Sequence, residues 1–221
     1  MTAVVAVDGP SGAGKSTVAR GVAAELGFDV LDTGAMYRAV TVAVLEAGVD
    51  PDDAAACAAV ARRAEIDQRG VTTRLDGRDV SAEIRTPAVT AVVSTVSAHP
   101  AVRAVLVERQ RAWAAARDAG VVEGRDIGTV VFPDAVLKVF LTASEAERAR
   151  RRHDEAGPDE GSNVDAVRAA LDRRDRLDRT RPTSPLRAAP DALRIDTTAR
   201  AVDDVVHEVV AAFRARTGAP R

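Results

Sequence analysis

The strongest indication of the fold of this chain is the segment Ala3-Val-Val-Ala-Val-Asp-Gly-Pro-Ser-Gly-Ala-Gly-Lys-Ser16. Its first five residues are a continuous apolar run typical of a buried strand, and a turn-rich loop follows from Gly9 to Gly14. From Ser16 to Leu26 apolar residues recur at helical spacing, so the predicted order is strand, loop, helix. The loop fits the pattern G-x-x-x-x-G-K-[ST], in which backbone N–H groups curl toward one point at the positive end of a helix. This stretch predicts a cradle for the phosphates of a nucleoside triphosphate.

The residues of this cradle have distinct expected roles. Lys15 neutralises the β and γ phosphates, and the Ser16 hydroxyl is placed to ligate Mg²⁺. An ordinary glycine-rich turn is the alternative, and it is disfavoured because strand, complete motif and helix coincide. The residues expected to contact the nucleotide are Gly9, Pro10, Ser11, Gly12, Ala13, Gly14, Lys15, Ser16 and Thr17.

The rest of the chain alternates strand patterns with helix patterns. Further strands are expected at residues 28–31, 121–123, 135–141 and 192–195, and helices at 36–47, 52–64, 87–97, 101–119, 145–153, 164–179 and 202–214. This alternation predicts an α/β fold with a mainly parallel sheet. The stretch from Val71 to Val80 differs, because Asp76-Gly77 inside an alternating pattern is a strong hairpin signal. We expect a small antiparallel insert there.

Composition narrows the classes of protein that are possible. The 221 residues carry 31 basic and 33 acidic side chains, and a net charge of −2 argues against a chain that mainly holds nucleic acid. Lys15 and Lys138 are the only lysines. Cys57 is the only cysteine and lies in an alanine-rich run, so we expect a small buried side chain. No apolar run approaches the roughly 18 residues of a membrane span, and no leader pattern opens the chain, so we expect a cytoplasmic protein.

Three further segments carry charges where ligands of parallel sheets gather. The segment 32–38 follows the second strand and the segment 124–128 follows the third. On the helix from 164, the apolar stripe that includes Leu171 continues into Arg174, Asp178 and Arg181. Charges on a face that should be buried indicate that this helix end lines a polar cleft. The alternative for segment 32–38 is an ordinary helix N-cap, and for segment 124–128 it is a surface salt bridge. The alternative for the end of the helix from 164 is a solvated helix end.

Taken together, these segments resemble the bacterial cytidylate kinases, which phosphorylate CMP and dCMP and belong to the P-loop nucleoside monophosphate kinases. The resembling segments are 8–16, Asp32-Thr-Gly-Ala-Met-Tyr-Arg38, 79–86, Gly124-Arg-Asp-Ile-Gly-Thr-Val-Val-Phe-Pro-Asp134 and Arg174-Asp-Arg-Leu-Asp-Arg-Thr-Arg181. The resemblance implies a five-stranded parallel core flanked by helices at residues 1–61 and 98–221. It also implies a monophosphate-binding insert at 62–97 and a short lid at 148–162.

The resemblance also implies the site residues. The implied catalytic residues are Lys15, Arg125, Asp126, Arg148 and Arg152, of which the last two are lid arginines that stabilise charge on the transferring phosphoryl group. The implied CMP-binding residues are Thr33, Tyr37, Arg38, Ser94, Arg103, Arg125, Asp126, Arg174, Asp178 and Arg181. A carboxylate at Asp126 accepts a hydrogen bond from the exocyclic amine of cytosine and is repelled by the O4 acceptor of uracil, so it discriminates between the two bases.

The implied activity is ATP-dependent, Mg²⁺-dependent phosphorylation of CMP and dCMP by in-line transfer, without a phosphoenzyme. A kinase for another acceptor, such as UMP, another monophosphate or a non-nucleotide alcohol, is the nearest alternative. A nucleotide-dependent switch protein is a second, but it would need an N-K-x-D motif, and neither lysine follows an asparagine. We expect a monomer with no nucleic-acid or membrane partner.

Overall fold

The computed structural model describes residues 2–156, 164–181 and 183–218. The chain divides into two compact units, one formed by Met1–Val30 with Ala119–Arg221 and the other by Leu31–Asp118. The second unit contains the whole of the insert expected at 62–97 and extends beyond it on both sides. The lid expected at 148–162 falls partly on a helix and partly outside the described residues.

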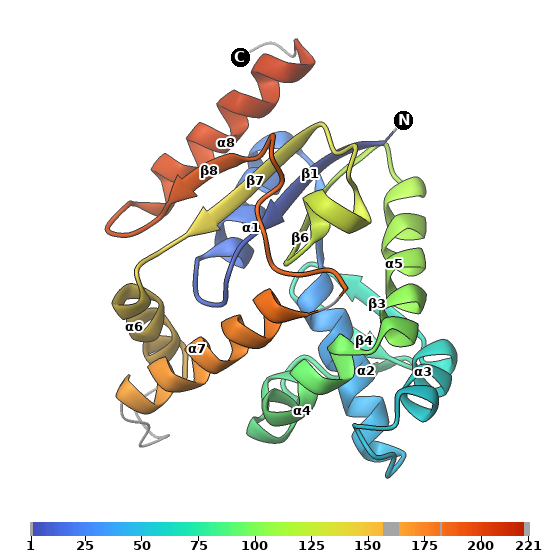
Figure 1. The fold of residues 1–221 in the computed structure, drawn as a ribbon. Coiled ribbons are helices and arrows are strands. Elements are labelled where there is room, and N and C mark those ends of the chain that lie inside the picture. Colours follow the sequence, from blue (N-terminus) through green and yellow to red (C-terminus); the bar gives the residue numbers. More distant parts are fainter. Residues whose placement is uncertain (1, 157–163, 182, 219–221) are drawn as a thin grey trace. The chain divides into compact units, whose positions relative to one another are not determined.

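The first unit is built on a parallel sheet. Its elements are β1 (Ala3–Asp8), α1 (Lys15–Leu26), β6 (Ala119–Gly124), the π-helical turn η2 (Ile127–Val131), β7 (Leu137–Thr142), α6 (Glu145–Ala156), α7 (Val164–Thr180), β8 (Leu193–Asp196) and α8 (Val202–Thr217) (Figure 1). With β2 (Asp29–Asp32), the strands form one five-stranded sheet in the order β2-β6-β1-β7-β8. The predicted α/β architecture is confirmed.

The central strand β1 explains why this sheet is parallel and buried. It pairs in parallel with β6 on one side and with β7 on the other, and β7 pairs in parallel with β8. Its apolar run leaves no polar face for water, as expected for a strand covered on both faces. Apolar side chains of α1 and α8, among them Val22 and Phe213, pack with β1, β7 and β8 in one core.

The second unit is mostly helical. Its elements are α2 (Thr33–Glu46), α3 (Ala54–Arg63), β3 (Ile66–Arg69), β4 (Thr72–Leu75), β5 (Arg78–Asp79), the 3-10 turn η1 (Glu83–Arg85), α4 (Pro87–Ala98) and α5 (Pro100–Ala115). The three strands form a separate antiparallel sheet. Asp76 and Gly77 both have positive φ between β4 and β5, so the predicted hairpin is confirmed. Strand β3 was not predicted, and Cys57 is fully buried as expected.

Several predicted helix limits were wrong, and the helices expected to end at 153 and 214 continue to Ala156 and Thr217. The helix expected to reach Ala119 ends at Ala115, because Ala119 pairs with Ala3 as the first residue of β6. The helix expected from Met36 already begins at Thr33, where the Asp32 side chain caps it. Within the described residues no single helix is long and apolar enough to cross a membrane. The bent pair α4 and α5, which meet at 93°, reaches that length and composition only jointly.

Candidate active site

The parallel strands of the first unit deliver four polar segments to one edge of the sheet, because parallel strands end on the same side. β1 leads into the P-loop, Gly9 to Ser16, and β6 leads into Arg125 and Asp126. β7 leads into α6, and β8 leads into the Asp196–Thr198 turn. This edge therefore gathers both the predicted phosphate cradle and part of the predicted acceptor site.

The P-loop has the backbone expected of a phosphate cradle. Gly14 caps α1 in a left-handed conformation, at φ 85°, and Lys15 begins the helix. The Lys15 ammonium donates to the Pro10 carbonyl oxygen at 2.8 Å, so the side chain bends back over the loop. Gly12 has φ +76°, and a Cβ there would lie 3.0 Å from the Cβ of Arg148. Both the backbone conformation and the close approach of α6 therefore favour glycine at position 12.

A buried ion pair holds the middle of the P-loop. The Ser11 N–H donates to Asp175 Oδ1 at 3.2 Å, and the Arg148 guanidinium donates to the Ser11 carbonyl oxygen at 3.1 Å. Arg148 and Asp175 are themselves ion-paired, and both are almost completely buried. Because α6 carries Arg148 and α7 carries Asp175, these two helices fix both backbone groups of Ser11.

The pair opens onto a polar cavity of about 310 Å³ between α6 and α7. It is lined by three arginines and three acids together with a threonine: Glu145, Arg148, Asp172, Asp175, Arg176, Arg179 and Thr180. Its α7 residues are not Arg174, Asp178 and Arg181, for which a polar cleft was predicted, so the cavity lies on another face of that helix.

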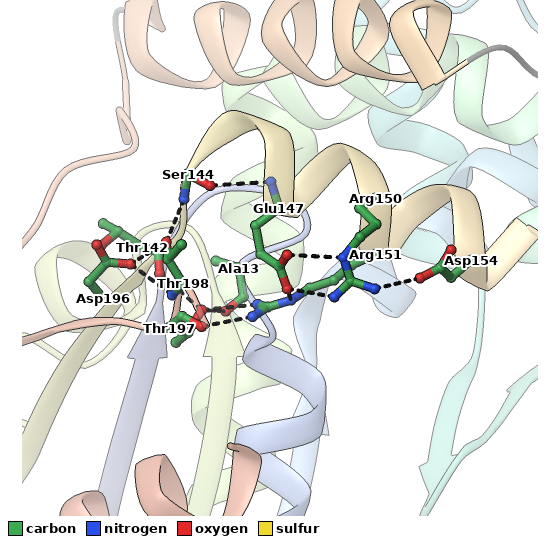
Figure 2. A network of polar contacts seen from close by, with 10 residues as sticks. All are labelled: Ala13, Thr142, Ser144, Glu147, Arg150, Arg151, Asp154, Asp196, Thr197 and Thr198. Atoms are coloured by element: carbon green, nitrogen blue, oxygen red, sulfur yellow. Dashed lines mark hydrogen bonds and ion pairs between the residues drawn. The ribbon is translucent and has the colours of Figure 1, made fainter. Parts of the chain in front are cut away.

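A second network supports the P-loop from β8 (Figure 2). The Thr197 hydroxyl donates to the Ala13 carbonyl oxygen at 3.2 Å, and Arg151 on α6 donates to that hydroxyl at 3.0 Å. Glu147 accepts from Arg151 at 2.8 Å and so orients its guanidinium. Arg151 is thus the α6 arginine tied to the P-loop from this side, whereas the predicted lid residue Arg152 is half-buried on the same helix.

The loop after β6 holds the predicted specificity residues of the first unit. Asp126 is 4% exposed, and Arg125 donates to Asp178 Oδ2 at 2.9 Å. Arg181 is also paired with Asp178. Burial raises the pKa of Asp178, but the surrounding guanidinium groups of Arg125, Arg181 and Arg174 outweigh burial and hold that pKa below its ordinary value. The structure therefore places Arg125 and Arg181 against the ionised carboxylate of Asp178.

The second unit holds the remaining predicted residues. Arg38 on α2 donates to the Ile84 carbonyl oxygen at 2.8 Å and to the Thr90 hydroxyl at 3.0 Å. The guanidinium of Arg103 lies 5.4 Å from the centre of the Tyr37 ring, within cation–π distance. Thr33 is buried in the first turn of α2, and Ser94 is half-buried on α4.

The start of α2 is also fixed by a residue that was not predicted. Gln68 on β3 donates to the Asp32 carbonyl oxygen at 2.8 Å and accepts from the Asp32 N–H at 3.1 Å. Asp32 in turn accepts from the Ala35 N–H at 2.9 Å. One amide side chain thus satisfies both backbone groups of the N-cap.

Sequence reasoning also missed Asp175 and Thr197. A signal existed for Asp175, since it lies four residues after Leu171 on the buried stripe of α7. Thr197 and Gln68 gave no comparable signal, because a single hydroxyl or amide after a strand is common in loops. Lys138, the second lysine, pairs with Asp191 at 2.9 Å.

The residues present fit a magnesium ion bound together with a nucleotide. Ser16 is the second residue of α1 and is half-buried, and no hydrogen bond of its hydroxyl is found among the described residues. Mg²⁺ usually takes one or two protein oxygens and completes its shell with phosphate and water. A single hydroxyl beside a phosphate cradle meets that requirement.

A parallel sheet whose central strand ends in a P-loop, with arginines and buried carboxylates at the same edge, defines a P-loop kinase. Two solved structures share the fold. A gluconokinase from Sinorhizobium meliloti aligns with a TM-score of 0.53 at 16% identity, over 98% of this chain and 94% of that one. An uncharacterized protein from Eubacterium ventriosum aligns with a TM-score of 0.58 at 12% identity, over 97% and 99%.

Sequence similarity narrows the class to one family. The cytidylate kinase profile matches residues 5–215. The cytidylate kinase of Mycobacterium leprae is 52% identical over 98% of this chain and 97% of its own length. That of Mycobacterium avium is 56% identical over 88% of each chain, and that of Streptomyces coelicolor is 52% identical over 94% of this chain and 90% of its own. The chain belongs to the cytidylate kinase family.

Proposed function

We propose that this chain transfers the γ-phosphoryl group of ATP to CMP and dCMP, with Mg²⁺, giving CDP or dCDP and ADP. The observation that carries the proposal is the buried carboxylate of Asp126 at the carboxyl end of β6, in a chain of the cytidylate kinase family. Such a carboxylate accepts from the cytosine amine and repels the uracil O4, and a buried polar group left without its partner is costly.

In the proposed mechanism the protein positions the reactants and neutralises charge. The backbone of the P-loop binds the ATP phosphates, and the Lys15 ammonium moves from the Pro10 carbonyl to their oxygens. Ser16 holds Mg²⁺, which neutralises phosphate charge when bound. The acceptor phosphate oxygen attacks the γ-phosphorus in line as the bond to the β-phosphate bridging oxygen breaks, so no phosphoenzyme forms.

The residues proposed to bind the acceptor differ in the part of CMP that they contact. Thr33, Tyr37, Arg38 and Arg125 hold the CMP phosphate, while Ser94, Arg103, Asp126 and Arg181 face cytosine and Arg174 with Asp178 faces the sugar. For the sugar contact, the support is the low pKa of Asp178, which keeps this carboxylate ionised and able to accept from ribose hydroxyls.

Arg148 and Arg152 are proposed to stabilise charge on the transferring phosphoryl group. For Arg148 this requires the guanidinium to exchange the Asp175 carboxylate for a phosphate oxygen, and the adjoining polar cavity leaves room for that movement.

We further propose that the lid at 148–162 and the insert at 62–97 close over the substrates and exclude water. The protein is proposed to be a cytoplasmic monomer, because ATP and CMP are cytoplasmic metabolites and no heptad pattern favours assembly.

A coupled ADP-release assay tests the proposal with CMP, dCMP, UMP, AMP and shikimate as acceptors. CMP and dCMP are expected to be turned over, with kcat/KM for UMP lower by at least about 100-fold, the range reached when a polar match is lost. Equal activity on CMP and UMP would show that Asp126 does not read the base. Turnover of shikimate in preference to CMP would replace the proposed acceptor.

A further inference from the structure

Asp8 is a buried carboxylate that the proposed mechanism does not use. It is the last residue of β1, directly before the first glycine of the P-loop, and it is 4% exposed. Its two oxygens accept from two consecutive backbone amides, the N–H of Ile127 and the N–H of Gly128, each at 2.8 Å. These amides belong to the turn that directly follows Arg125 and Asp126.

The two hydrogen bonds connect segments that are far apart in sequence but adjacent in the sheet. β1 and β6 pair in parallel up to Asp8 and Gly124, so both chains leave the sheet at the same level. Beyond that level the backbone pairing stops, and the Asp8 carboxylate replaces it. Asp8 thus fixes the position, relative to the start of the P-loop, of the turn that carries Asp126.

The other side of the same turn is fixed by the side chain of Lys138. A Cβ at Gly128 would lie 3.1 Å from the Lys138 Cγ, so the turn packs tightly against the lysine stem and a larger residue would have to displace it. Lys138 is held in turn by Asp191 at 2.9 Å. Gly128 is therefore held by the Asp8 carboxylate, which accepts from its N–H, and by the aliphatic chain of Lys138, which packs against it. This packing gives Lys138 a structural role.

We propose that Asp8 is a positioning residue that sets the position of the Asp126 carboxylate and thereby the discrimination between cytosine and uracil. The proposal rests on the function proposed above, in which Asp126 reads the base. Asp8 is not among the residues proposed to contact the base or the phosphates. It acts because an ionised carboxylate is the one side chain of this length that accepts from both amides at once.

The Asp8→Asn variant tests this role with little change of shape. The asparagine oxygen accepts from one amide, but its NH₂ group points a donor at the other, so the turn loses its fixed position. We expect the ratio of kcat/KM for CMP to kcat/KM for UMP to fall by about tenfold or more, with a higher KM for CMP. We expect the dissociation constant for ATP to change by less than about threefold, since Ile127 and Gly128 do not belong to the P-loop.

The matched control is Asp53→Asn. Asp53 also accepts from two consecutive backbone amides, those of Ala55 and Ala56, at 3.0 and 2.9 Å, but it caps α3 and belongs to no proposed site. It is expected to leave both kcat/KM values unchanged. The Asp126→Asn variant is measured beside them to test the proposed function separately.

The outcomes separate the two proposals. If Asp126→Asn loses discrimination and Asp8→Asn keeps it, Asp8 is not a positioning residue while the proposed function stands. If Asp126→Asn keeps discrimination, the base-reading role fails instead. Equal losses on CMP, UMP and ATP binding in Asp8→Asn, or a variant that does not fold, would make Asp8 merely structural and overturn the inference.

Hydrogen exchange gives a readout that is independent of activity and that can first be made on the wild-type protein. In the wild-type protein without substrates, the amides of Ile127 and Gly128 are expected to exchange at least about 100-fold more slowly than the exposed amides of Gly70 and Val71. In Asp8→Asn, exchange at 127 and 128 is expected to accelerate while the amides of α8 keep their rates. Rapid exchange at both positions in the wild-type protein would also overturn the inference.

Discussion

Removal of the Asp175 carboxylate is the most informative perturbation of the P-loop. Asp175→Leu leaves the Arg148 guanidinium buried, at 5% side-chain exposure, with the Ser11 carbonyl oxygen as a hydrogen-bond acceptor and with Asp172, 3.9 Å away and partly exposed, as its ionic partner. It also leaves the Ser11 N–H without an acceptor. Breaking a buried pair from one side costs about 3–5 kcal/mol, and an unpaired buried amide costs about 1 kcal/mol or more. We therefore expect the free energy of unfolding to fall by about 4–6 kcal/mol.

The double variant should recover most of this loss. Arg148 Nε is buried and has no hydrogen-bond partner among the described residues, so the pair is incompletely satisfied even in the wild-type protein. Replacing both partners by apolar residues of similar size is often neutral. Arg148→Met/Asp175→Leu is expected to lie within about 2 kcal/mol of the wild type, although each single variant loses more. The coupling between the two positions should then exceed about 2 kcal/mol.

Urea unfolding followed by circular dichroism at pH 7.5 measures these differences. Glu208→Gln serves as a control, because its ion pair with Arg200 is exposed and such pairs contribute about 0–1 kcal/mol. The single variants should also raise KM for ATP more than KM for CMP, since Ser11 lies in the P-loop. A loss below about 1 kcal/mol in Asp175→Leu, or strictly additive single variants, would refute the reasoning.

Three further predictions concern the charged groups at the sheet edge. Lys15→Ala should lower kcat by at least about 1,000-fold while circular dichroism stays unchanged, because the charge on the β and γ phosphates loses its neutralising cation; retained turnover would contradict the phosphate-cradle assignment. Asp126→Ala should lose the preference for CMP over UMP more than affinity for ATP; weaker ATP binding in place of lost discrimination would contradict the acceptor assignment. Burial, with a smaller contribution from the charge of Asp126, raises the pKa of Asp8 to about 6, although two backbone amides and Lys15 act in the opposite direction. Between about pH 4 and pH 6, Asp8 is then protonated in more of the folded molecules than of the unfolded ones. Above pH 6 the ionised carboxylate lowers the free energy of unfolding by on the order of 3 kcal/mol. The stability of the wild type relative to Asp8→Asn should therefore rise as pH falls from 7 to 5, and a difference independent of pH between 5 and 7 would show that the pKa is not raised.

Burial opposes the charge of ionised Asp8 at neutral pH, whereas its two backbone hydrogen bonds favour the ionised form and hold the turn at residues 127 and 128. Functional sites often need groups that are preorganised in this way.

Much of the fold was predictable because its signals are local. The apolar run from Ala3, the glycine-rich loop and the helical spacing after Ser16 occupy adjacent residues, so each constrains the next. The Asp76-Gly77 hairpin is local in the same sense, since positive φ at two consecutive residues selects one turn type. Strand β3 escaped prediction because its sequence Ile-Asp-Gln-Arg is short and mostly polar, and pairing with β4 gives it its structure. Ala119 was assigned to a helix by propensity, and pairing with Ala3 overrode that preference.

The candidate site likewise has one part that local sequence signals predict and another part that depends on tertiary contacts. Adjacent residues predicted the phosphate cradle, and the ordered motifs that carry the family resemblance predicted the charged residues proposed for CMP. The sequence by itself could not pair Arg148 with Asp175, place Thr197 under Ala13 or join Asp8 to residues 127 and 128. These partners lie between 27 and 184 positions apart, and a hydrogen bond between them leaves no periodic trace in either segment. Only the parallel sheet, by ending its strands at one edge, decided which of these polar groups meet.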